Sequence, residues 1–544
     1  MQCTKYSFSR TDTTSDGELG TVNDKRFYVV RVALIVALGG FLMGFDASVI
    51  SGVVRFIGPE FGLTSLQVGW AVGSLTLTAT LAMLTAGPLS DRFGRRAILM
   101  VAAILYAVSA IGSALAPDFL SFVIARMVGG LGVGASLIVA PMYIAEIAPP
   151  ASRGRLVSLN QLNIVVGISA AFFSNYLILQ WSQSDAAWVQ VLLMDAHAWR
   201  WMLAVETVPA FFFLIGLTRV PQSPRWLIMK GMHEQAAVTL NRIFEPAETD
   251  RQIADIQRNL KADAGREKLA LADLFHPALR LVLVTGVVLA VLQQITGINA
   301  VFFYAPMIFE QSGIGADAAF MQAVLVGLTN LAFTVVAMLL IDKLGRRPLL
   351  LGGMTGIALS MMLLAYGFGS ATYELSDEGI RTLELPAAVV VALSDMQGIS
   401  YSNDVSFRQA LVETLGEENA RSHESDIIAT AIDINPGLIL FGILFFVASF
   451  AVSIGPVMWV MFSELFPLRV RGLAISFAGF INSGVSFLVQ LVFPWEMATL
   501  GNSITFLIYG LFAAIGLLFI WKVVPETKNR SLEELEVELT IAKR

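Results

Sequence analysis

The segment DRFGRR, residues 91–96, recurs as DKLGRR at residues 342–347, and each copy lies between two long apolar runs. A second motif, E-x-x-P followed by R-G, begins at residue 146 and begins again with the same spacing at residue 464. The two halves of the chain therefore repeat each other. Two six-span units related by an axis along the membrane normal are one known transporter arrangement, with the binding site near the midplane between them.

The composition is that of a polytopic membrane protein. Hydrophobic residues make up 56% of the chain and charged residues only 14%, and the mean hydropathy is +0.70, far from the soluble average. Apolar runs of about 20 residues, the length that crosses a bilayer, predict about twelve spans and an all-α fold. The predicted spans are 29–53, 65–89, 97–116, 119–145, 157–180 and 199–219 in the first half, and 278–308, 317–341, 348–369, 436–462, 473–495 and 503–524 in the second.

Basic residues predict the orientation of these spans. They gather in alternate loops, which are expected in the cytoplasm together with both termini. These loops are 91–96, 152–155, 342–347 and 468–472. The connection 370–435 then lies outside, and it is either a small folded cap or mostly disordered. Its many acids, among them Glu374, Asp377, Glu378, Glu417, Glu418 and Glu424, outnumber its bases Arg381, Arg408 and Arg421, which fits that side.

Five parts of the chain are expected. They are a cytoplasmic tail at 1–28, a six-helix half at 29–219, a cytoplasmic helical linker at 220–276, a second six-helix half at 277–524 and a cytoplasmic tail at 525–544. The start of the chain has no pattern of a removable signal peptide, so the first span is expected to direct insertion into the plasma membrane. The single cysteine, Cys3, excludes an intrachain disulfide, and neither a zinc site nor a nucleic-acid surface is expected.

Neutral amides are the main polar groups in the second half. Gln293, Gln294 and Asn299 fall on the seventh predicted span, Asn330 on the eighth and Asn482 on the eleventh. An amide both donates and accepts hydrogen bonds, as a hydroxyl does, so these groups favour an uncharged ligand that is rich in hydroxyls. Gly297 would let the seventh span unwind locally between them. The alternative is that the amides only bond neighbouring helices to one another.

A carboxylate stands inside the first span. Asp46 lies in FLMGFDASVISG, residues 41–52. A charge at the centre of a bilayer costs about 2.5–3.5 kcal/mol even on the lenient insertion scale, so Asp46 is expected to be either neutral or paired.

The motifs together resemble the sugar porter family of the major facilitator superfamily, over about residues 30–530. They are GFDASVISG, GPLSDRFGRR, PMYIAEIAPPASRGR, NQLNIVVG, PQSPRWL, QQITGINAVFFYAP, DKLGRRP, GPVMWVMFSELFPLRVRG and PETK. The resemblance implies an alternating-access transporter in which the amides contact a sugar, joined by Gln161, Gly455 and Trp459. Phe303 and Ser483 depart from the family, whose xylose and animal glucose transporters carry tyrosine and tryptophan there.

The resemblance also assigns roles to the charged residues. It pairs Asp46 with Arg126 on the fourth span and adds Glu206 on the sixth as a further acid, a set that belongs to the proton-coupled members. The cytoplasmic motifs would form ion pairs that lock the inner side; the alternative is that their bases only set topology. These gate residues are Asp91, Arg95, Arg96, Glu146, Arg155, Asp342, Arg346, Glu464 and Arg471.

The predicted function is proton-coupled symport of a monosaccharide or a related polyol such as inositol, by a monomer in the lipid bilayer. One alternative is an uncoupled facilitator of the same fold, and another is a nutrient-sensing receptor on a transporter scaffold. The spans hold no paired catalytic carboxylates and no clustered histidines, and His197 has no evident partner. An enzyme is therefore not expected, nor any cofactor beside the coupling proton.

Overall fold

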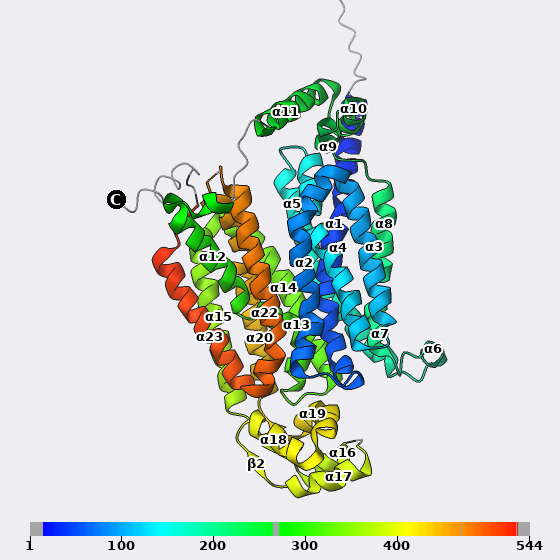
Figure 1. Cartoon of the computed structure of the whole chain (residues 1–544), viewed down its shortest axis with the longest axis vertical. Helices are drawn as coiled ribbons and strands as arrows, with labels where there is room; N and C mark the ends of the chain where they lie inside the picture. Colours follow the sequence, from blue (N-terminus) through cyan, green and yellow to red (C-terminus); the bar gives the residue numbers. More distant parts are fainter. Residues whose placement is uncertain (1–14, 265–270, 384, 468, 529, 531–544) are drawn as a thin grey trace, which may run out of the picture.

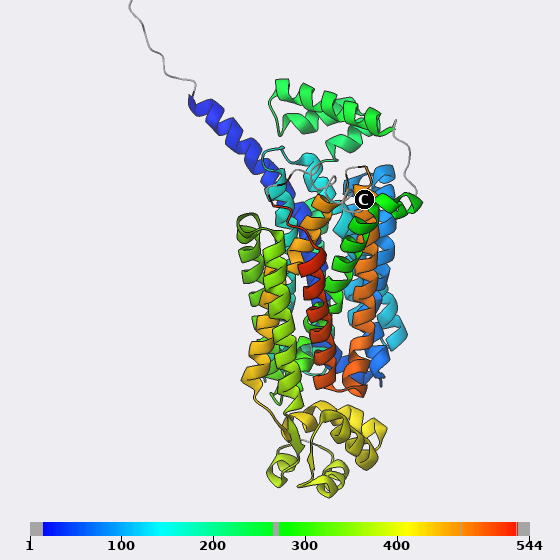
Figure 2. The same cartoon turned by 90° about the vertical axis from the view of Figure 1, so that its left-hand side faces the viewer.

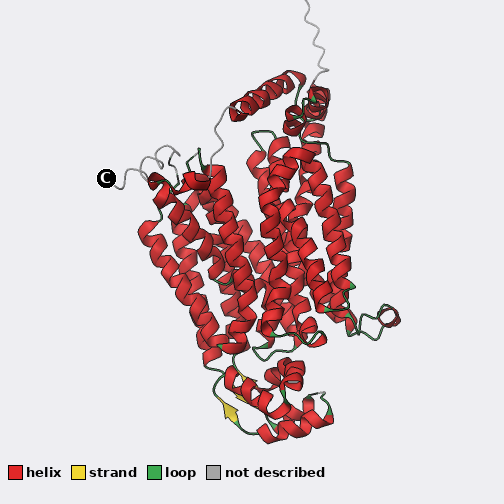
Figure 3. Ribbon diagram, viewed as in Figure 1, coloured by secondary structure: helices red, strands yellow, loops and turns green. Residues whose placement is uncertain are grey.

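The fold is known from a computed structural model that describes residues 15–264, 271–383, 385–467, 469–528 and 530. Among the described residues, twelve spans are long and apolar enough to cross a membrane, which confirms the predicted number. They form two groups of six that stand side by side (Figure 1), and nearly all of the molecule is helical (Figure 3). The structure thus has the predicted all-α architecture of two six-helix halves.

The first half runs from α1 to α8. It contains α1 (Ser15–Glu60), α2 (Ser65–Phe93), α3 (Arg95–Ala114), α4 (Phe119–Ile147), α5 (Arg153–Ser182) and the short α6 (Ala187–Val191); its sixth span is divided into α7 (Ala198–Ala204) and α8 (Thr207–Thr218). The helix α1 starts well before the predicted span. Its early part projects from the bundle (Figure 2), and Lys25 on it pairs with Glu245 of the connecting segment between the halves.

The second half runs from α12 to α23. It contains α12 (Arg280–Ile295), α13 (Ile298–Glu310), α14 (Ala316–Leu344), α15 (Arg346–Gly369), α20 (Pro436–Val452), α21 (Ile454–Leu465), α22 (Arg471–Thr499) and α23 (Asn502–Val523). Two of its spans are divided, the seventh into α12 and α13 and the tenth into α20 and α21.

The repeated motif forms the same turn in both halves. Gly94 separates α2 from α3, and Gly345 separates α14 from α15, with φ of 97° and 96°. Glycine takes up this backbone conformation at little cost, whereas a side chain would be strained there. The sequence repeat is therefore a repeat of structure.

The two ends of the bundle carry different additions (Figure 2). At one end lie the linker helices α9 (Pro224–Met229), α10 (His233–Asn241) and α11 (Pro246–Ala264), followed by the 3-10 turns η1 (Leu271–Phe275) and η2 (Pro277–Leu279). At the other end the connection 370–435 is folded rather than disordered. This cap contains β1 (Thr372–Glu374), α16 (Asp377–Thr382), α17 (Ala387–Leu393), η3 (Ser394–Met396), β2 (Ser400–Tyr401), α18 (Asp404–Leu415), α19 (Glu417–Ala431) and β3 (Ile432–Asp433).

The cap has a hydrophobic core of its own. Its three strands pair antiparallel in the order β2-β1-β3. Tyr373 stacks on Phe407, with ring centroids 5.5 Å apart, and Leu393, Leu411 and Ile427 are buried around them. The side chains of Glu418 and Arg421, two charges counted in the sequence, lie outside the described residues.

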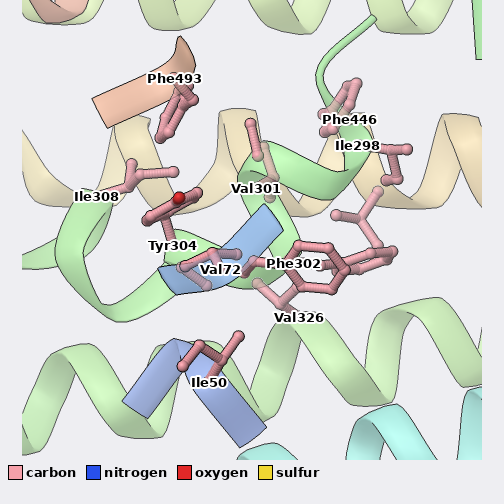
Figure 4. Close-up of a cluster of buried hydrophobic side chains, with 14 of the residues drawn as sticks. Ile50, Val72, Ile298, Val301, Phe302, Tyr304, Ile308, Val326, Phe446 and Phe493 are labelled. Carbon is pink, nitrogen blue, oxygen red and sulfur yellow. The ribbon is translucent and has the colours of Figure 1, made fainter. Parts of the chain in front are cut away.

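On the side of the cap, the interface between the halves is filled by apolar side chains. Ile50 of α1 and Val72 of α2 belong to the same buried cluster as Val301 and Ile308 of α13 (Figure 4). The backbones also approach closely there, since a Cβ added at Gly69 of α2 would lie 2.0 Å from a backbone oxygen of α22. The two halves are therefore sealed together at this end.

Candidate functional site

A cavity of about 510 Å³ lies between the two halves. Residues of α1, α2, α4 and α5 line it on one side, and residues of α12, α13, α14 and α20 to α22 line it on the other. Its lining reaches Pro141 and Ile475, which lie toward the linker end of their helices, while the cap end is sealed by the apolar cluster. The cavity therefore extends toward the side of the linker.

The break in the seventh span positions the amides. Gly297 separates α12 from α13 with φ of 90°, and a Cβ there would come within 2.7 Å of the Tyr509 ring. Only glycine fits both the backbone conformation and the space. Gln293 and Gln294 end α12, and Asn299 starts α13, so the break brings all three amides to the cavity.

The amides form one hydrogen-bonded network. The Gln294 Nε2 donates to Oδ1 of Asn482 at 3.1 Å, and the Asn299 Nδ2 donates to Oε1 of Gln294 at 2.8 Å. The Asn482 Nδ2 donates to Oε1 of Gln293 at 2.8 Å. Buried polar groups need such partners, and a ligand with hydroxyls can replace them bond for bond because an amide both donates and accepts.

The other residues predicted to contact a ligand also line the cavity. Gln161 lies on α5 and Asn330 on α14, while Gly455 and Trp459 lie on α21. The backbone oxygen of Gly455 accepts a hydrogen bond of 2.8 Å from Nε2 of Gln293. Trp459 is 40% exposed and lines the cavity.

Several polar residues of the cavity were not predicted from the sequence, and three of them extend the amide network. The Ser486 Oγ accepts a hydrogen bond of 2.6 Å from Asn299, and another of 2.8 Å from Nε2 of Gln490. Thr76 on α2 donates to Oε1 of Gln490 at 2.9 Å, so the network crosses from one half to the other. Ser486 and Gln490 follow Asn482 at spacings of four and eight residues, which place them on one helix face; that periodicity was the signal that could have identified them.

The charged group of the first half is separate from the amides. Arg126 forms an ion pair with Asp46, and its Nη2 donates to the backbone oxygen of Asp46 at 3.2 Å. Both side chains are buried. Glycine at position 129 lets α4 approach, since a Cβ there would lie 2.9 Å from Oδ2 of Asp46. Glu206, at the break between α7 and α8, is buried and close enough to interact electrostatically with both.

The motifs at the linker end form ion pairs within each half. Arg95 pairs with Asp91 at 2.8 Å and with Glu146 at 3.0 Å. Arg346 likewise pairs with Asp342 at 3.2 Å and with Glu464 at 2.9 Å. These pairs join span ends, as expected.

Three of the predicted gate residues make other contacts. Arg96 donates to the backbone oxygens of Leu217 and Thr218, at 2.9 and 2.8 Å. The Arg471 Nε donates to the backbone oxygen of Phe466 at 3.0 Å. Arg155 lines a second cavity at the base of α1. Arg96 and Arg471 are thus bonded to carbonyl oxygens of their own half, and none of the three forms an ion pair among the described residues.

Two six-helix halves, with a cavity between them that contains a network of amides, define a membrane transporter of the major facilitator type. The family model described as "Sugar (and other) transporter" matches residues 32–385 and 425–539. The chain belongs to this sugar transporter family.

Curated relatives extend over nearly the whole chain. The arabinose-proton symporter of Bacillus subtilis (strain 168) is 35% identical over 510 residues, which are 94% of each chain. The D-xylose-proton symporter of Escherichia coli (strain K12) is 34% identical over 543 residues, 94% of this chain and 95% of the relative.

Solved structures of the xylose transporter XylE from E. coli share the fold. Its inward-open conformation matches with a TM-score of 0.71 and 32% identity, covering 94% of this chain and 99% of XylE. The same symporter bound to 6-bromo-6-deoxy-D-glucose matches with a TM-score of 0.65 and 33% identity, covering 94% and 99%. The inward-open conformation thus has the higher of these two TM-scores.

Proposed function

We propose that this chain imports a monosaccharide or a related polyol together with a proton by alternating access. The observation that carries the proposal is that the two halves place different polar groups in and near the cavity. Neutral amides of the second half line it, and a buried Asp46–Arg126 pair stands behind it in the first half. A ligand with several hydroxyls suits the amides, and a carboxylate that can lose its cation partner suits a proton.

In the proposed cycle, the two halves rock about the site; the proton binds in the first half, and the sugar binds in the cavity, mainly to amides of the second half. The amides around Gln294 exchange their mutual hydrogen bonds for bonds to sugar hydroxyls, and Trp459 covers the apolar face of the ring. A proton on Asp46 removes the charge that holds Arg126, and loss of the proton restores the pair. Glu206 is the nearby acid through which that proton would pass.

The proposed orientation places the linker and both termini in the cytoplasm and the cap outside. The bases of the repeated motifs gather at the linker end, as the positive-inside rule requires, and the cap is rich in acids. The protein would then be a multi-pass protein of the cell membrane, and a monomer.

The named relatives carry arabinose and xylose, which makes pentoses and hexoses the first candidates here. Phe303 lines the cavity without a phenolic hydroxyl, and Ser483 lines it without an indole ring. Both changes remove groups that would otherwise hold a sugar, so the preferred sugar is expected to differ from those of the relatives.

Uptake into proteoliposomes tests the proposal. The purified chain is reconstituted and given an inward pH gradient, and accumulation of labelled glucose is measured with competing xylose, galactose, fructose or inositol. We expect accumulation above the outside concentration, abolished by a protonophore. Equilibration that ignores the protonophore would instead identify an uncoupled facilitator, and no flux of any of these compounds would overturn the proposal.

A further inference from the structure

The cap rests on the second half of the transporter. The Asp404 Oδ2 accepts a hydrogen bond of 2.9 Å from the backbone N–H of Asn502, at the start of α23. Arg408 donates to the backbone oxygen of Met497 at 2.8 Å. At Gly313, just after α13, an added Cβ would lie only 2.7 Å from the Ile432 side chain of the cap. These contacts tie the cap to three segments of the same half.

One side chain of the first half reaches both the cap and the second half. Arg55, near the end of α1, lies 2.7 Å from Oε1 of Glu310 at the end of α13. Its other terminal nitrogen lies 3.2 Å from Oδ1 of Asp426, on α19 of the cap. The three residues come from three separate parts of the molecule, and the family model does not match residues 386–424 of the cap.

The charge balance makes this cluster specific to one conformation. The Glu310 side chain is only 3% exposed, and Arg55 is its ion-pair partner. A buried carboxylate that loses its cation is strongly destabilised. Separation of the halves at this end would pull Arg55 away from Glu310 and from Asp426, because both move with the second half.

We propose that Arg55 is a positioning residue of the transport cycle, which holds the cap end closed by pairing with Glu310 and with Asp426 of the cap. This proposal rests on the proposed function for its cycle, but the contact itself does not depend on which substrate is carried. The cap thereby adds a second, more exposed anchor to a gate between the halves.

Spin labels measure the opening directly. Leu66, at the cap end of α2, and Ala318, at the cap end of α14, are exposed and belong to different halves. Both are changed to cysteine in a Cys3→Ser background, and distance distributions are recorded by pulsed electron resonance for the full chain in lipid nanodiscs. The distance ratio is the number of molecules with the longer label distance divided by the number with the shorter one. Arg55→Gln should raise this ratio about tenfold, which is the effect of losing one charge-assisted contact.

The partner variants separate the two contacts. Glu310→Gln should raise the ratio as much as Arg55→Gln does, and the double variant should add little to either one. Asp426→Asn should have a smaller effect, because its side chain is 56% exposed. Asp377→Asn is the matched control, since Asp377 pairs at 2.7 Å with Arg381 inside the cap at similar exposure, and it should change nothing.

Arg200→Gln controls for the loss of a half-buried arginine. Arg200 pairs with Glu60 at 2.9 Å within the first half, and its exposure matches that of Arg55. It should leave the distance ratio unchanged even if it lowers the melting temperature. Equal distributions for Arg55→Gln and the parent would overturn the proposal, as would an equal shift by Arg200→Gln. Failure of sugar uptake by the parent would instead overturn the proposed function, and the label distances would still stand.

Discussion

At the linker end the two halves are alike. Glu146 is held by Arg95 and by the Ser223 hydroxyl, and Glu464 is held by Arg346 and by the Thr527 hydroxyl. In the middle of the membrane the halves differ. The first half buries the charges of Asp46 and Arg126, whereas the second half presents neutral amides to the cavity. The two halves therefore share one frame but differ in the chemistry of their middle sections, which under the proposed function serves the proton in the first half and the sugar in the second.

The largest effect should come from removing the charge in the first half. Asp46→Asn resembles a permanently protonated acid and cannot pair ionically with Arg126. We expect sugar-for-sugar exchange to survive, because the amides are untouched, while uphill uptake driven by a pH gradient is lost. Parallel measurement of exchange and of accumulation in proteoliposomes checks this.

Asp317→Asn is a suitable control for Asp46→Asn, since Asp317 is exposed at the cap end of α14. It should accumulate sugar as the parent does. Normal, pH-dependent accumulation by Asp46→Asn would show that proton coupling does not depend on this charge, and the contrast between the halves would lose its functional meaning.

Removing an amide of the second half should weaken binding without uncoupling. Gln294→Ala deletes bonds to Asn482 and Asn299 and any bond to the ligand. Substrate affinity should fall by about 1–3 kcal/mol, which is about 5- to 150-fold in Kd, while the remaining uptake still responds to the pH gradient. Calorimetric titration and uptake measure the two properties separately.

Gln322→Ala serves as the amide control, because Gln322 lies on α14 away from the cavity lining. Its affinity should match that of the parent. If Gln294→Ala binds every transported sugar as tightly as the parent does, the amide network is only a contact between helices.

Removal of the hydrogen bond from Thr76 to Gln490, which links the two halves, should have a moderate effect on substrate affinity. Thr76→Val keeps the shape of the side chain and removes the hydroxyl that donates to Gln490 at 2.9 Å. A hydrogen bond of this kind contributes about 0.5–1.5 kcal/mol, so affinity should change by about two- to tenfold. Thr76→Ser retains the hydroxyl and should behave as the parent; an equal change in both variants would mean that packing, and not the hydrogen bond, is responsible.

Much of this architecture could be predicted from the sequence. The number of spans followed from apolar run length, and Gly297 marked the break that brings Gln294 and Asn299 together. Those features are local, so a short window contains them. Contacts between distant segments could not be predicted. Arg55 and Glu310 are far apart in the chain, and in the sequence each looks like an ordinary charged residue at the end of a span. The fold of the cap was also left open, because its small core depends on how short elements pack together.

The smallest effects should come from changes to the ion pairs at the linker end, where the two halves are alike. Glu464→Gln weakens the pair with Arg346 and leaves the bond from Thr527 possible; Glu146→Gln does the same to Arg95 in the first half. Each pair lies within one half and is therefore present in both conformations. Its loss changes the balance between the conformations only if the span ends that it joins shift. We therefore expect an energy difference between the conformations of only about 0.2–1 kcal/mol, which shifts the ratio of inward-open to outward-open molecules by about one- to fivefold.

Labelling of cysteines placed at the linker end, the proposed cytoplasmic side, measures this ratio in both variants. If the two halves act as equivalent supports, the two shifts will be similar and will add in the double variant, as independent sites do. A large shift for one glutamate and none for the other would show that the repeat is only structural, and that the two halves differ at their inner ends as they do at the midplane.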